Sequence, residues 1–119
     1  MESIIVISPR NDEEKNIIGQ WEGRADFCGL VSDNRVTLET EKGHIFIDFG
    51  DDEEIRSEYA DEAVDFDIGN KYFYVISYSD RDFVADFLKK TKFADGCLFD
   101  NDRGEITDYS NLIKQDFAF

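Results

Sequence analysis

The chain has 119 residues, of which 41% are hydrophobic and 14% aromatic, and this suits one folded domain over residues 1–119. Its 28 acidic residues outnumber its 13 Lys and Arg residues, so the formal net charge is -15. This charge argues against nucleic acids and membrane surfaces as partners, because both are bound through Lys and Arg. A basic protein is the natural partner for the negative field of this chain. The simpler, alternative explanation of the charge is that it keeps the protein soluble.

The first elements are separated by clear breaks. Residues 3–8 are a β-branched apolar run typical of a buried strand, which Pro9 ends. Asn11 and Glu14 resemble a capping box at the start of a helix, and Gly23 ends this helix.

Three further strands are expected before the middle of the chain. Residues 27–31 form the first of them. Residues 35–40 and 44–49 both alternate between apolar and polar side chains, with residues 41–43 as the loop between them. This pattern predicts a β-hairpin.

The second half repeats the alternation of strands and helices. Residues 72–78 are aromatic and β-branched throughout, so we expect a strand with both faces covered. Asp80 is a good cap for a helix whose apolar stripe lies within residues 83–88. Short strands follow at residues 96–99 and 105–107, and Asp108 caps a last helix.

These elements predict an α+β fold. One antiparallel or mixed sheet of about 5–6 strands, covered by about 2–4 helices, accommodates their order along the chain.

Residues 48–67 carry the strongest charge bias. Ten acidic residues are opposed by Arg56 alone, so ten less one leaves about nine negative charges. Crowded carboxylates repel one another, and a partner rich in Lys and Arg relieves this repulsion on binding. A short helix is expected if the apolar residues of the segment anchor it, namely Ile55, Tyr59, Ala63 and Val64. The expected partner-contacting residues are Asp48, Asp51, Asp52, Glu53, Glu54, Glu58, Tyr59, Asp61 and Glu62.

Aromatic residues often anchor protein interfaces, and several tyrosines are available for this role. The candidates are Tyr59, Tyr72, Tyr74 and Tyr78. Packing within the strands is the alternative for these tyrosines, and a solvated face is the alternative for the acidic segment.

The residues that usually carry chemistry are scarce. His44 is the one histidine, and Cys28 and Cys97 do not form a zinc motif, so no metal ligand is assigned. Residues 100–105 resemble the opening of a calcium-binding loop, but Glu105 stands where that loop requires glycine. No phosphate-binding glycine motif is present. We therefore expect no enzyme activity, no catalytic residue and no cofactor.

The location of the protein is expected to be cytoplasmic. The N-terminus lacks the basic region and the apolar stretch of a signal peptide, and no apolar run approaches the ~20 residues that span a bilayer. In that compartment Cys28 and Cys97 are expected to be reduced and buried.

The last third of the chain carries a family resemblance. The strand of residues 72–80, the helix after it, and residues 98–106 with their Asn-Asp-Arg-Gly turn form a strand–helix–strand unit. In a small acidic α+β protein, this unit is similar to the immunity proteins of bacterial polymorphic toxin systems, including contact-dependent growth inhibition. The resemblance implies tight binding of a cognate toxin domain, often a basic nuclease, and it carries over no catalytic residue.

Two other interpretations remain open at the level of sequence. A DNA mimic, which inhibits a nucleic-acid-binding protein, shares the acidity but spreads its carboxylates over the surface instead of concentrating them in one segment. A small ligand-binding or metal-binding domain belongs to a different class, and a metal-dependent rise in thermal stability would support it.

Overall fold

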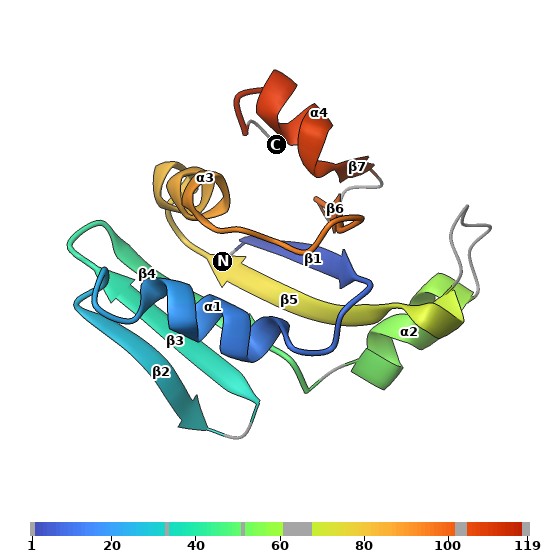
Figure 1. The fold of residues 1–119 in the computed structure, drawn as a ribbon, viewed down its shortest axis with the longest axis horizontal. Coiled ribbons are helices and arrows are strands. Elements are labelled where there is room, and N and C mark those ends of the chain that lie inside the picture. Colours follow the sequence, from blue (N-terminus) through green and yellow to red (C-terminus); the bar gives the residue numbers. More distant parts are fainter. Residues whose placement is uncertain (1, 33, 51, 61–67, 102–104, 118–119) are drawn as a thin grey trace.

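The computed structural model of the chain describes residues 2–32, 34–50, 52–60, 68–101 and 105–117 (Figure 1). Its strands are β1 (Glu2–Ser8), β2 (Phe27–Ser32), β3 (Arg35–Thr40), β4 (Gly43–Asp48), β5 (Tyr72–Tyr78), β6 (Leu98–Asp100) and β7 (Ile106–Asp108). Its helices are α1 (Glu13–Trp21), α2 (Asp52–Ala60), α3 (Arg81–Lys90) and α4 (Tyr109–Lys114), with the short 3-10 helix η1 (Ile68–Asn70) before β5.

The strands form one antiparallel sheet. Their order is β2-β3-β4-β5-β1-β6-β7, so β1 lies between β5 and β6. This confirms the predicted α+β class, although seven strands are present in the described part of the chain where about five or six were expected. The two shortest strands, β6 and β7, have three residues each, and they lie close to the short strands expected at residues 96–99 and 105–107.

The two faces of the sheet are covered unequally. Because side chains alternate along a strand, Ile4 and Val6 of β1 point to one face while Ile5 and Ile7 point to the other. The first face is covered by α1, α3 and α4, and we call it the three-helix face (Figure 1). The second is packed against α2, near the start of β5, and we call it the α2 face.

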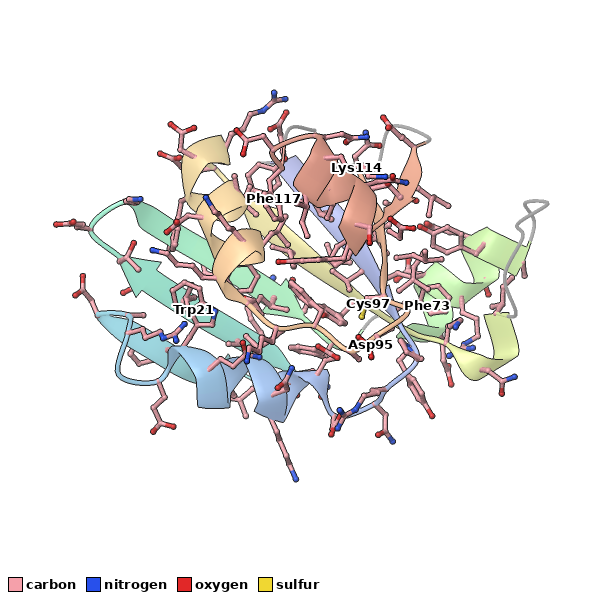
Figure 2. All side chains as sticks on the ribbon, turned by 45° about the horizontal axis from the view of Figure 1, so that its top comes forward. Trp21, Phe73, Asp95, Cys97, Lys114 and Phe117 are labelled. Atoms are coloured by element: carbon pink, nitrogen blue, oxygen red, sulfur yellow. The ribbon has the colours of Figure 1, made fainter. Side chains whose placement is uncertain are left out.

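The core of the three-helix face is largely aromatic. Trp21 of α1 stacks on Phe87 of α3 with ring centroids 5.5 Å apart, and its Nε1 donates a 2.8 Å hydrogen bond to Thr91. Phe117 is also buried in this core. In Figure 2, Trp21 lies close to α1 and Phe117 lies beside α4. These contacts fix α1, α3 and α4 over the sheet.

Two of the three predicted helix starts are confirmed. The carboxylate of Asp80 accepts a 2.9 Å hydrogen bond from the Phe83 amide at the start of α3. Asp108 caps α4 in the same way, accepting a 2.8 Å bond from the Asn111 amide.

The predicted capping box of α1 is wrong. The helix begins after Asp12 instead of Asn11, and no side chain caps its amides. The side chains near this end have other partners. Asp12 pairs with Arg10, and the carboxylate of Glu13 is buried, where it accepts hydrogen bonds from Ser8 and from the Ala94 amide.

Replacing the cap of α3 tests how much such bonds stabilise the fold. The Asp80→Ala variant leaves the Phe83 amide without its partner, so the free energy of unfolding should fall by about 1 kcal/mol. Urea denaturation measures this change. Asp12→Ala is the matched control, because Asp12 occupies the same position of α1 without a capping bond and should cost less. Equal losses would show that the capping bond of Asp80 contributes nothing specific.

Candidate protein-binding surface

Helix α2 forms within the acidic segment because two apolar residues share one side of it. Ile55 and Tyr59 are four residues apart, so they lie one above the other, and they are 6% and 3% exposed. The predicted short helix anchored by these residues is therefore confirmed. Ala63 and Val64, which were expected to extend it, lie outside the described residues.

Tyr59 connects α2 to two strands that are distant from it in the sequence. Its ring stacks on Phe73 of β5 with centroids 5.3 Å apart, and its hydroxyl donates a hydrogen bond to the carboxylate of Asp100 on β6. Figure 2 shows Phe73 beside this helix. Tyr59 is thus a core residue, and its assignment to the partner-contacting set is corrected. Tyr74 and Tyr78 are buried too, whereas Tyr72 is 42% exposed.

Arg56, the one base of the acidic segment, is turned back toward the protein. Its guanidinium lies 5.2 Å from the centre of the Phe73 ring. It donates hydrogen bonds to the carbonyl oxygens of Ile68 and Lys71, the latter at 2.6 Å. These carbonyls belong to the segment that enters β5. The guanidinium of Arg56 therefore holds α2 against the segment that enters β5.

The outer surface of α2 carries carboxylates. Glu53, Glu54 and Glu58 are exposed, and none of them forms an ion pair with another described residue. We call these three residues the α2 acidic set. Because the guanidinium of Arg56 is turned toward the protein, it does not balance the charge of this set on the outer surface of α2. The set therefore produces a local negative field.

Asp48 has a different environment. Its carboxylate is held by two hydrogen bonds from Arg35, at 2.6 and 3.1 Å, and its side chain is only 20% exposed. Asp51, Asp61 and Glu62 lie outside the described residues, and for Asp52 only the backbone is described.

A part of the α2 face lies beyond the helix, on β2, β3 and β4. The residues that point to it were not predicted as contacts. They are Phe27, Gly29, Thr37, Glu39, His44 and Phe46, with Ser77 of β5 continuing the row of Thr37 and Phe46. We call this group the open half. The alternation of β3 and β4 was visible in the sequence, but which of their two faces a helix covers was not.

A cluster of polar groups is buried beside α1. The Glu13 carboxylate lies within 3.3 to 3.5 Å of three donors, the Ser8 and Tyr74 hydroxyls and the Ala94 amide. Burial raises the pKa of Tyr74 well above its usual value. Burial also raises the pKa of Cys97, to about 11, so this thiol is protonated and a poor nucleophile near pH 7.

A groove lies at the C-terminal end of α3. It has a volume of about 830 Å³, and Asp95 and Cys97 line it on the segment that leads from α3 to β6 (Figure 2). Lys89, Lys90 and Lys92 also border it. None of its lining residues belongs to the acidic segment, so it is separate from the α2 acidic set.

Among the described residues, no three His, Cys, Asp or Glu side chains are grouped so that they could hold a metal ion. Residues 102–104 of the calcium-like turn lie outside that part of the chain. No helix that the structure describes is both long enough and apolar enough to cross a bilayer. Cys28 and Cys97 are both free, as expected, but Cys28 is only half-buried.

Comparisons with protein-family models, curated proteins and solved structures find no match for this chain.

The reactivity of Cys97 tests the environment of the buried cluster. In a Cys28→Ser background, iodoacetamide should modify native Cys97 about 100-fold more slowly at pH 8 than the urea-unfolded chain, because a pKa near 11 instead of 9.0 leaves far less thiolate. The rate should climb as the pH rises toward 11. Mass spectrometry follows the reaction, and equal rates in the native and unfolded chains would contradict the buried position.

Proposed function

We propose that this chain is an immunity protein, an antitoxin that binds a cognate basic toxin domain and neutralises it. The observation that carries the proposal is the arrangement of α2. Its apolar residues and its one arginine face the protein, so three carboxylates are left on the outside without an ion-pair partner among the described residues. The resemblance of residues 72–106 to immunity proteins suggested the same function.

The physical consequence of this arrangement favours a cationic protein partner. A local excess of one charge speeds the encounter with the opposite charge, and a rigid helix holds the carboxylates in fixed positions before binding. Basic nucleases present Lys and Arg around their nucleic-acid sites. A toxin of this class would therefore be blocked where it needs its own positive charge.

The proposal includes a location and a mode of action. The protein acts in the cytoplasm, where a nuclease toxin finds its substrate, and it acts by binding instead of by catalysis. It needs no cofactor and no metal ion.

Affinity capture identifies the partner and tests the proposal. The tagged chain is incubated with lysate of its source cells, to which the product of the neighbouring gene is added, at about 0.15 M salt. We expect one stoichiometric basic protein. Expressed alone, that protein should arrest bacterial growth, and co-expression of this chain should restore growth. A mixture of DNA-binding proteins that is lost as salt rises would favour the DNA mimic instead.

Removing the α2 acidic set should weaken the complex without unfolding the chain. In the variant Glu53→Gln, Glu54→Gln, Glu58→Gln we expect association about tenfold slower at low salt, with a smaller difference at high salt. Surface plasmon resonance with the captured toxin measures the rates.

The control for this prediction removes the same charge from other surfaces. Glu22, Glu41 and Asp82 are exposed, and the variant Glu22→Gln, Glu41→Gln, Asp82→Asn should bind nearly as the original chain does. Equal slowing in both variants would mean that net charge, and not α2, drives the encounter.

A further inference from the structure

The α2 face has more area than one helix can cover. Seven strands at ~4.8 Å spacing make a sheet about 30 Å wide, whereas a helix with its side chains covers only about 10 Å. On the three-helix face, α1, α3 and α4 share this area. On the α2 face, Glu39 and His44 of the open half are exposed and Phe46 is half-buried, so no described helix closes over them.

The centre of the open half is aromatic. Phe46 is bordered by the His44 ring, 5.1 Å away, and by the Arg35 guanidinium, 5.1 Å from its centre. Phe27 is 42% exposed, and its ring turns toward Gly29, since a Cβ on Gly29 would lie 3.7 Å from the Phe27 Cζ. Exposed aromatic side chains around a flat surface are typical of the centre of a protein interface.

Thr37 provides a second observation on the same surface. It lies between Gly29 and Phe46 in the register, points to the open half and is 4% exposed. Its Oγ1 is buried and has no hydrogen-bond partner in the described structure. A buried hydroxyl without a partner is costly, and a polar group of a docked molecule would remove that cost.

The orientation of α2 turns two of its carboxylates away from the start of β5. Arg56 reaches the carbonyls of Ile68 and Lys71, which precede β5, so its flank of the helix faces the start of that strand. At 100° per residue, Glu54 and Glu58 lie on the opposite flank. That flank therefore faces away from the start of β5, in the direction of Ser77. Arg35 does not offset these charges, because Asp48 already holds its guanidinium.

We propose that the open half is the docking site for an amphipathic helix of the partner, with apolar residues on one side and Lys or Arg on the other. The apolar side packs on Phe46 and Phe27, a polar group reaches Thr37, and the cationic side lies against Glu54 and Glu58. The helix lies beside α2 as a second helix of this layer. This inference rests on the proposed function and names the part of the toxin that is recognised.

The test uses a defined peptide and the full chain. An approximately 16-residue helical peptide with Leu on one side and Lys on the other is titrated into the ¹⁵N-labelled protein, and chemical shifts report where it binds. We expect shifts in β2, β3, β4 and α2. The dissociation constant should rise about tenfold in Phe46→Thr and in the double variant Glu54→Gln, Glu58→Gln, and severalfold in Thr37→Val.

Controls separate this site from general attraction to an acidic protein. The variant Glu22→Gln, Asp82→Asn loses the same charge as the Glu54/Glu58 pair and should keep its affinity, and a peptide with Gln in place of Leu should bind weakly. Circular dichroism checks that each variant is folded. Shifts confined to α1 and α3, or unchanged affinity in both Phe46→Thr and Thr37→Val, would overturn the inference.

Growth rescue then distinguishes this inference from the proposed function. In one outcome, Phe46→Thr restores growth as fully as the original chain while the triple variant of the α2 acidic set does not. The toxin then binds α2 without the open half. The proposed docking site is wrong in that case, and the immunity function stands. If the original chain neutralises no toxin, the immunity function is wrong, and the peptide titration alone decides whether the surface binds a basic helix.

Discussion

The structure depends on strands that are apolar on both sides. In β1, Ile4 and Val6 point one way and Ile5 and Ile7 point the other, and all four are buried. A strand of this kind is stable only when something apolar covers each face of the sheet. Three helices do this on one face. On the other face α2 covers Ile5, Ile7 and Phe73, so a helix has to form in the most acidic part of the chain.

This requirement explains why the residues of α2 have different roles. Ile55 and Tyr59 supply the apolar contact that the sheet needs, and Arg56 donates hydrogen bonds to the backbone carbonyls of Ile68 and Lys71. The carboxylates are left on the surface, where their mutual repulsion costs stability. We propose that these surface carboxylates serve the recognition of a cationic partner.

Local patterns in the sequence predicted the local structure, and contacts between distant residues were missed. The β3–β4 hairpin and the Asp80 and Asp108 caps depend on neighbours within a few residues, and they were predicted correctly. Tyr59 was misassigned because its burial depends on Phe73 and Asp100, far along the chain. The helical α2 could be anticipated from the spacing of Ile55 and Tyr59. The inward turn of Arg56 and the uncovered position of Phe46 could not be anticipated from the sequence, because both follow from how the sheet is assembled.

The position of β1 in the interior of the sheet also determines when the fold can be completed. Its residues pair with residues 72–78 on one side and with residues 98–100 on the other. Such pairings between distant segments are slow to form, because the entropy of closing a long loop is lost before the strands make their stabilising contacts. At a synthesis rate of about 5–20 residues per second, the Ile4–Ile7 run waits roughly 5–20 s on the ribosome for its partners. The Ile-rich β1 is therefore an apolar segment without its strand partners during this interval.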